Sequence, residues 1–173
     1  MIALIGLPGC GKSTVGRQLA RRLQVPFLDS DSVIETRLGY SIKEAFERDG
    51  EAHFRDLEES VLDELSQIAE AVISTGGGAI LRAATRQRLR ERGTVVYLNA
   101  HPDKIFRRLQ NDTTRPLLQV ANPIGRLREL YAARNPLYRE AAHFIIDTGR
   151  PSVNTLINTI LMQLEQSKLA IKK

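Results

Sequence analysis

The chain has 173 residues, of which 42% are hydrophobic and 26% charged, so it fits one globular domain over residues 1–173 and is too apolar for a disordered chain. No apolar stretch approaches the ~18 residues that a membrane-spanning helix needs. Its single cysteine, Cys10, cannot form an internal disulfide and fits a reducing compartment. Met1–Leu7 has no basic residue and is too short an apolar run for a signal peptide, so we expect a cytoplasmic protein.

The net charge of +5 hides two regions of opposite sign. Residues 29–70 carry 13 acidic and 4 basic side chains, a net charge of −9, whereas residues 82–139 carry 13 basic and 4 acidic ones, a net charge of +9. A basic region of this kind favours either a nucleic acid or a ligand rich in phosphate. Aromatic residues make up 5% of the chain and none is tryptophan, which argues against a stacking platform for single-stranded nucleic acid.

Short apolar runs alternate with segments of helical periodicity along the whole chain. The predicted strands are Ile2–Ile5, Pro26–Leu28, Val72–Thr75, Val95–Leu98 and Phe144–Asp147. Ser41 and Ser152 are predicted to begin helices as N-caps, and a further helix is expected over Ser32–Leu38. This alternation predicts an α/β fold, with a parallel sheet covered by helices on both faces, in which ligands bind at the carboxyl ends of the strands.

The segment Gly6–Thr14 reads GLPGCGKST and matches the phosphate-binding P-loop pattern G-x-x-x-x-G-K-S/T, directly after a predicted strand and before a helix. Its glycines let backbone N–H groups converge on phosphate oxygens, and the helix N-terminus adds positive potential. Lys12 is expected to reach the β- and γ-phosphates, and the Ser13 hydroxyl to bind Mg²⁺. Cys10 is interpreted as a small residue that fills the loop.

Two acidic residues follow the second predicted strand, in the sequence Asp29-Ser-Asp31. One carboxylate can hold Mg²⁺ through water while the other accepts a proton from a hydroxyl nucleophile. The alternative, that either acid is only the N-cap of the following helix, stays open. The chain has no N-K-x-D motif for guanine, and Asp147, at the end of the last strand, is interpreted as an unrelated acid.

A second group of motifs lies further along. Arg55 and Glu58 are three residues apart, so Glu58 can hold the Arg55 guanidinium in place for a carboxylate ligand. Gly76–Gly78 follows a buried strand and can let a ligand approach the backbone. The alternatives are a solvated ion pair and a loose loop. Arg115 lies in a segment with little helical pattern, suited to a closing loop, and Arg134 begins the sequence RNPLYRE. The three histidines show no metal-ligand spacing.

Taken together, the motifs G-x-x-x-x-G-K-S, D-S-D, F-R-x-x-E, G-G-G, R-P-L-L and R-N-P-L-Y resemble those of the shikimate kinases over about Ile2–Pro151. The resemblance implies a three-layer P-loop kinase fold with a five-stranded parallel sheet of order 2-3-1-4-5. It also implies a substrate-binding region over about residues 32–60 and a lid over about residues 110–122. The implied reaction is the ATP-dependent phosphorylation of the 3-hydroxyl of shikimate, on the route to chorismate and the aromatic amino acids.

The same resemblance implies roles for individual residues. The implied catalytic residues are Asp31, Lys12 and Arg115. The implied ATP-binding residues are Gly9, Cys10, Gly11, Lys12, Ser13, Thr14, Arg108, Arg115 and Arg150. The implied shikimate-binding residues are Asp31, Arg55, Gly76, Gly77, Gly78 and Arg134. Mg²⁺ would be held by Ser13 and, through water, by Asp29. Some members have a tryptophan near the substrate ring, where this chain offers Phe46 and Phe54.

Two other functions are weighed against this one. A gluconate-type kinase would also phosphorylate a hydroxy acid from a small P-loop fold. A nucleic-acid-binding protein would use residues 82–139, but acidic residues interrupt that region and aromatic residues are not interleaved with it. We therefore expect a monomer with small-molecule partners, and neither a nucleic acid nor a membrane as partner.

Overall fold

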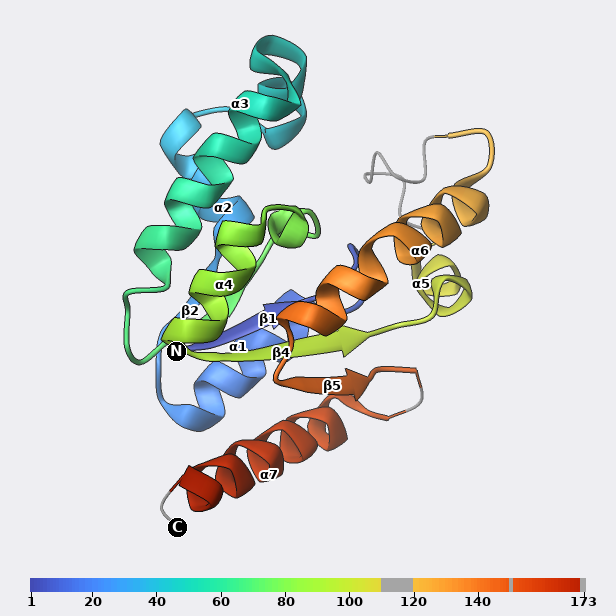
Figure 1. The fold of residues 1–173 in the computed structure, drawn as a ribbon. Coiled ribbons are helices and arrows are strands. Elements are labelled where there is room, and N and C mark those ends of the chain that lie inside the picture. Colours follow the sequence, from blue (N-terminus) through green and yellow to red (C-terminus); the bar gives the residue numbers. More distant parts are fainter. Residues whose placement is uncertain (110–119, 150, 172–173) are drawn as a thin grey trace.

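Five parallel strands form one sheet in the computed structural model, which describes residues 1–109, 120–149 and 151–171 (Figure 1). The strands are β1 (Ile2–Ile5), β2 (Phe27–Asp29), β3 (Val72–Ser74), β4 (Thr94–Asn99) and β5 (Phe144–Asp147). Their order across the sheet is β2-β3-β1-β4-β5. The predicted sheet order is confirmed, and each predicted strand is present with its ends shifted by one residue at most.

The register of the strands brings their carboxyl ends to one edge. Leu4 of β1 lies beside Ser74 of β3, and Ser74 lies beside Asp29 of β2. Side chains that follow β1, β2 and β3 therefore meet at this edge, although long stretches of sequence separate them.

Helices cover both faces of the sheet. They are α1 (Lys12–Leu23), α2 (Ser30–Leu38), α3 (Ile42–Leu65), α4 (Ala83–Arg92), α5 (Pro102–Leu109), α6 (Pro123–Ala141) and α7 (Val153–Ile171), with a short 3₁₀ helix η1 (Ala79–Leu81). Figure 1 shows α1 and α7 on one face and α4 and α6 on the other, which makes the three predicted layers. No helix in the described part of the chain combines the length and the apolar composition needed to cross a bilayer.

Local capping explains where several helices begin. The Ser41 hydroxyl accepts the Glu44 N–H at 3.2 Å, and the Ser152 hydroxyl accepts the Thr155 N–H at 3.2 Å, so both predicted N-caps are confirmed. Helix α2 begins at Ser30, two residues earlier than predicted, because the Asp29 carboxylate accepts the Asp31 N–H at 3.1 Å. This earlier start places Asp31 in the first turn of α2.

Two apolar clusters form the core. The larger one joins the sheet to α1, α6 and α7. The smaller one includes Ile34, Phe54, Val61 and Leu62, and packs α2 and α3 against each other and against Ile73 of β3. The segment predicted to bind the substrate thus has an apolar cluster of its own.

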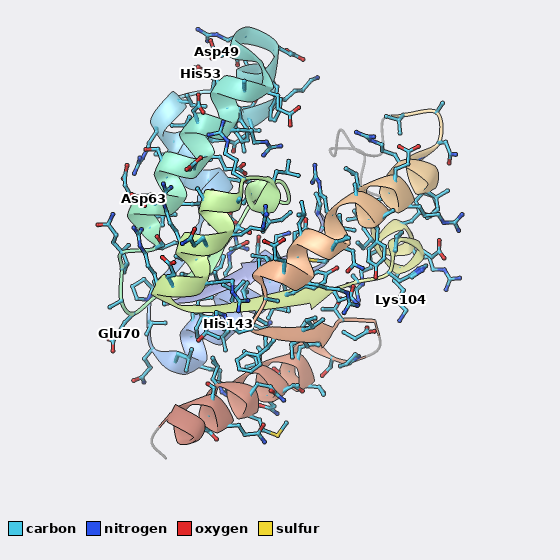
Figure 2. The ribbon with its side chains drawn as sticks, viewed as in Figure 1. Asp49, His53, Asp63, Glu70, Lys104 and His143 are labelled. Atoms are coloured by element: carbon cyan, nitrogen blue, oxygen red, sulfur yellow. The ribbon has the colours of Figure 1, made fainter. Side chains whose placement is uncertain are left out.

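Ion pairs join α3 to α4 and to Arg82, the residue before α4, and so bring acidic and basic side chains of the two charged regions together. The pairs are Arg82–Asp56, Arg82–Glu59, Arg88–Glu59, Arg88–Asp63 and Arg92–Asp63. Asp63, labelled in Figure 2, is the α3 residue that pairs with Arg88 and Arg92 of α4. Three of the 13 acidic side chains therefore pair with Arg82, Arg88 and Arg92, so these three arginines are not a free surface for phosphate.

Candidate active site

The P-loop connects β1 to α1 and has the backbone shape that its glycines permit. Gly9 has φ 82°, and Gly11, the residue before α1, has φ 103°. A side chain is disfavoured at both positions, so glycine is required for this turn. Helix α1 starts at Lys12 directly beyond it, which aims the N-terminal N–H groups and the positive end of the helix dipole into the loop.

Two side chains of the loop are turned inward. The Lys12 ammonium group is largely buried and donates to the carbonyl oxygens of Gly6 at 2.9 Å and Leu7 at 3.0 Å. Cys10 is 1% exposed, its N–H donates to the Leu7 carbonyl at 3.2 Å, and its Sγ lies 3.8 Å from the Lys12 Nζ. The thiol thus fills the inside of the loop, as the sequence predicted.

Asp29 is the N-cap of α2, the alternative that the sequence left open, and its second carboxylate oxygen is turned toward the P-loop. One carboxylate oxygen accepts the Asp31 N–H and caps α2, while the other accepts the Ser13 hydroxyl at 2.8 Å. The Ser13 Oγ also lies 3.5 Å from the Ser74 Oγ. Several oxygen atoms therefore gather beside the first residues of α1.

Two cavities open at this edge of the sheet. The P-loop cavity, of about 570 Å³, is lined by residues 8–15 together with Asp29, Arg108 and Thr148. The arginine cavity, of about 870 Å³, is lined by Phe46, Phe54, Arg55, Glu58 and residues 76–78. Both cavities share Pro8, Asp31, Gly77 and Leu109 as lining residues. Asp31 therefore stands where the two cavities meet.

The environment of Asp31 raises the pKa of its carboxyl group to about 6. The main cause is burial, which disfavours the charged form, and the carboxylates of Asp29 and Glu58 add to it. The Lys12 ammonium group acts in the opposite direction. A carboxylate with a pKa near neutrality can both accept and release a proton, which suits a general base.

Arg55 is held in the arginine cavity from several sides. Its Nη1 donates to Glu58 at 2.6 Å, and its Nη2 and Nε face Glu51 at 3.2 and 3.3 Å. The rings of Phe46 and Phe54 lie 5.7 and 5.3 Å from the guanidinium carbon. Only 14% of the Arg55 side chain and 4% of the Glu58 side chain are exposed. The Arg55–Glu58 pair is therefore buried, and the solvated ion pair considered above is wrong.

The three glycines at Gly76–Gly78 form a closely packed segment. The Gly76 N–H donates to the Ser30 hydroxyl at 3.1 Å. A Cβ atom at Gly77 would lie 2.7 Å from the Pro8 ring, and one at Gly78 would overlap the Arg55 guanidinium. Glycine is needed because neighbours approach the backbone this closely, so the alternative of a loose loop is also wrong.

Of the four other arginines predicted for the site, Arg134 and Arg108 are described by the structure, and Arg115 and Arg150 are not. Arg134 on α6 and Arg55 both act on Glu58: burial raises the Glu58 pKa, and the two positive charges oppose that rise. Arg108 on α5 donates to the Thr148 carbonyl at 2.6 Å at the mouth of the P-loop cavity. Arg115 and Arg150 lie outside the described residues, as does the predicted lid except for residues 120–122.

The histidines and Asp147 line neither of the two cavities. His53 is exposed on α3, and His143 precedes β5, where its Nδ1 accepts the Val95 N–H at 3.0 Å (Figure 2). Asp147 is exposed at the end of the edge strand β5 and accepts the Gly149 N–H at 2.6 Å. Two buried site residues were not singled out from the sequence, Ser30 and Tyr138. Tyr138 belongs to the quoted R-N-P-L-Y motif, which could have pointed to it.

A P-loop at the end of β1, a parallel sheet of order 2-3-1-4-5 and a buried acid between two cavities define this chain as a P-loop kinase. A family model described as "Shikimate kinase" matches residues 8–165. The chain is 61% identical to a shikimate kinase of Paracidovorax citrulli (strain AAC00-1), over 95% of this chain and 91% of the relative. It is 54% identical to one of Burkholderia pseudomallei (strain K96243), over 99% and 93%. The chain belongs to the shikimate kinase family.

Solved structures agree with this assignment. Shikimate kinase from Acinetobacter baumannii in complex with shikimate has a TM-score of 0.91 and 46% identity, and the match covers 97% of this chain and 94% of that one. Shikimate kinase from Aquifex aeolicus has a TM-score of 0.82 and 37% identity, with coverage of 97% and 98%. A gluconokinase from Sinorhizobium meliloti is 18% identical with a TM-score of 0.58, which is a likeness of fold alone.

Proposed function

We propose that this chain transfers the terminal phosphoryl group of ATP to the 3-hydroxyl group of shikimate, giving shikimate 3-phosphate and ADP. The reaction lies on the route to chorismate and the aromatic amino acids. The observation that carries this function is the position of Asp31, between a cavity built around a P-loop and a cavity that contains a fixed arginine. A hydroxy acid bound in the second cavity can thus present its hydroxyl to a nucleotide bound in the first.

In the P-loop cavity, the N–H groups of residues 9–14 bind the phosphates and Lys12 neutralises the charge of the terminal one. Arg108 and Arg150 flank the adenine. Arg115, on a lid over about residues 110–122, reaches the transferring phosphoryl group when the lid closes. For Lys12 and Arg108 the support is their place on the cavity wall. For Arg115 and Arg150 it is the family motif in the sequence.

Ser13 and Asp29 are the residues that would hold Mg²⁺, Ser13 directly and Asp29 through water. Their side-chain oxygens are 2.8 Å apart beside the P-loop, and oxygen is the ligand that Mg²⁺ prefers. The ion supplies neutralisation of the phosphate charge when it is bound.

Arg55, in the arginine cavity, and Arg134 bind the carboxylate of shikimate. Gly77 and Gly78 offer backbone N–H groups to the ring, and Gly76 lines the same cavity. Guanidinium groups suit this task because their planar fork matches a carboxylate. The surrounding region, about residues 32–60, comprises most of α2 and α3, which share the smaller apolar cluster. It therefore orients one face of the substrate toward Asp31.

The chemical step needs little from the protein beyond position and charge. The 3-hydroxyl oxygen forms a bond to the terminal phosphorus as the bond from that phosphorus to the bridging oxygen of ADP breaks. The hydroxyl proton passes to a carboxylate oxygen of Asp31. Holding the two reactants in line and neutralising the phosphate charge lowers the barrier.

We further propose that the chain acts as a cytoplasmic monomer, with small molecules as its partners. Asp31, Arg55 and the P-loop residues come from one chain and line two adjoining cavities. The cytoplasm supplies ATP and keeps a free cysteine reduced.

A coupled assay of ADP release tests the function. Shikimate, gluconate and nucleoside monophosphates are compared as acceptors at equal concentration with Mg-ATP. We expect turnover with shikimate and little above background with the others. Faster turnover with gluconate would move the assignment to a gluconate-type kinase. Tight, salt-sensitive retention of nucleic acid would favour the nucleic-acid-binding alternative.

A further inference from the structure

Tyr138 on α6 makes a contact that the roles above do not use. Its side chain is fully buried, and its hydroxyl donates a hydrogen bond of 2.5 Å to the carbonyl oxygen of Gly77. Gly77 lines both the P-loop cavity and the arginine cavity. We propose that Tyr138 is a positioning residue, which fixes the peptide between Gly77 and Gly78 so that the Gly78 N–H is presented to the acid substrate. This inference rests on the proposed function.

Because the peptide bond is planar, a hydrogen bond that fixes the Gly77 carbonyl also fixes the direction of the Gly78 N–H. In a trans peptide the C=O and the following N–H point in opposite directions, and the described chain has no cis peptide. Because Tyr138 holds the Gly77 carbonyl, the Gly78 N–H points away from Tyr138. Gly78 itself packs against the Arg55 guanidinium. A fixed N–H donor thus lies close to the arginine proposed to bind the substrate carboxylate.

This N–H is free to bind a ligand. Within the described ranges, the N–H groups of Gly77 and Gly78 donate to no protein acceptor, whereas the Gly76 N–H is taken by Ser30. A backbone donor left without a partner is costly unless water or a ligand accepts it. Donors fixed in advance bind an anion or a hydroxyl oxygen without having to reorganise.

The surroundings of Tyr138 hold its hydroxyl in place. Its ring stacks on Tyr97 of β4, with the ring centres 4.9 Å apart. The Gly77 backbone also lies against the Pro8 ring of the P-loop. Burial raises the pKa of the Tyr138 hydroxyl well above its usual value, so the hydroxyl stays protonated and remains a donor. Gly77 is therefore held between α6 and the P-loop.

Tyr138 also lies beside a second group assigned to the substrate. Arg134 is four residues earlier on α6, which places both residues on one face of the helix. The Arg134 charge acts on the Tyr138 hydroxyl and partly opposes the effect of burial on its pKa. Loss of the hydroxyl should therefore affect the substrate more than ATP, since its contacts are with the glycine segment and with Arg134.

Tyr97 offers a matched control. It is also buried and stacked in the same pair. Its hydroxyl lies 3.0 Å from Asn99 Oδ1 and 3.1 Å from Asn135 Oδ1, and among the described residues it makes no hydrogen bond to the glycine segment. A single net hydrogen bond corresponds to a change of roughly 2- to 12-fold. We expect Tyr138→Phe to raise KM for shikimate within that range, with kcat and KM for ATP nearly unchanged. Tyr97→Phe also removes a buried hydroxyl group, so it should lower Tm by about as much as Tyr138→Phe does. It should leave KM for shikimate as in the wild type.

An unchanged KM for shikimate in Tyr138→Phe, or an equal rise in Tyr97→Phe, would overturn the proposal. If Tyr138→Phe does not fold, the wild-type protein labelled with ¹⁵N-glycine gives a second measurement. Shikimate should shift the Gly78 amide resonance strongly, and an unshifted resonance at saturation would also overturn the proposal. A wild type that does not phosphorylate shikimate would refute the proposed function instead, so the two failures are distinguishable.

Discussion

Asp31 and Glu58 approach each other across the α-carbon of Gly76. A Cβ atom on Gly76 would lie 2.7 Å from Oδ1 of Asp31 and 2.7 Å from Oε1 of Glu58. The two carboxylates belong to different helices, α2 and α3, and the negative charge of Glu58 helps to raise the Asp31 pKa. The absence of a side chain at Gly76 therefore permits the close approach that shapes the proposed base.

Gly76→Ala should displace at least one of these two carboxylates, since neither contact leaves room for a methyl group. A displacement of about 1 Å in an active site can cost on the order of 10²-fold, and we expect a loss of that size in kcat/KM. Gly125→Ala, in the first turn of α6, is a control for a comparable clash outside the site, because the three atoms nearest its Cβ all belong to the side chain of the N-cap Asn122. Steady-state kinetics of both variants check this, and wild-type activity in Gly76→Ala would contradict it.

Asp31→Asn should abolish most of the activity and stabilise the fold. The amide cannot accept the hydroxyl proton, and general bases contribute about 10²- to 10⁴-fold. ATP affinity should stay near that of the wild type. At pH 8 the variant also removes a buried charge close to Asp29 and Glu58, so its Tm should exceed that of the wild type by a few degrees. Calorimetry and turnover measurements test both parts, with the exposed residue change Asp49→Asn as a neutral control (Figure 2). A lower Tm in Asp31→Asn would contradict the buried-charge argument.

The pH dependence of the wild type should follow the same carboxyl group. The folded-state pKa of Asp31, about 6, lies above its usual value of 3.8, so the folded protein binds this proton more tightly than the unfolded chain does. The stability that protonation of Asp31 contributes is present below pH 3.8 and is lost as the pH rises through 6. The Tm advantage of Asp31→Asn should therefore shrink at pH 5. Activity, in contrast, should decrease as the pH falls through 6.

Because only the ionised carboxylate accepts a proton, kcat/KM should fall about tenfold per pH unit below pH 6. A pH–rate profile of the wild type measures this directly. A profile that stays flat down to pH 5 would exclude Asp31 as the base.

Sequence patterns predicted the parts of the fold that depend on local order. Buried strands are continuous apolar runs, and the P-loop is a contiguous motif, so both can be recognised without tertiary contacts. Helix α4 could not be predicted in this way, because few of its residues are apolar and ion pairs with the distant helix α3 hold it.

The candidate site likewise has parts that the sequence could predict and parts that depend on contacts between distant residues. Motifs indicated Asp31 and Arg55, but the raised pKa of Asp31 depends on a carboxylate from another helix. The bond from Tyr138 to Gly77 joins residues 61 positions apart, and no spacing rule could have predicted it.

Arg55→Lys should weaken shikimate binding although the positive charge is kept. Lysine cannot form the planar fork that a carboxylate accepts, and the variant also loses the geometry of the 2.6 Å contact with Glu58. Hydrogen bonds to charged groups contribute about 1.5–3 kcal/mol, so KM for shikimate should rise on the order of 10- to 100-fold, with KM for ATP nearly unchanged. Arg37→Lys provides the control, since Arg37 forms a similar fork with Glu64, at 3.0 and 2.6 Å, on the exposed outer side of α2 and α3. Isothermal titration with shikimate separates binding from turnover, and equal affinities for the wild type and Arg55→Lys would show that Arg55 is not the carboxylate clamp.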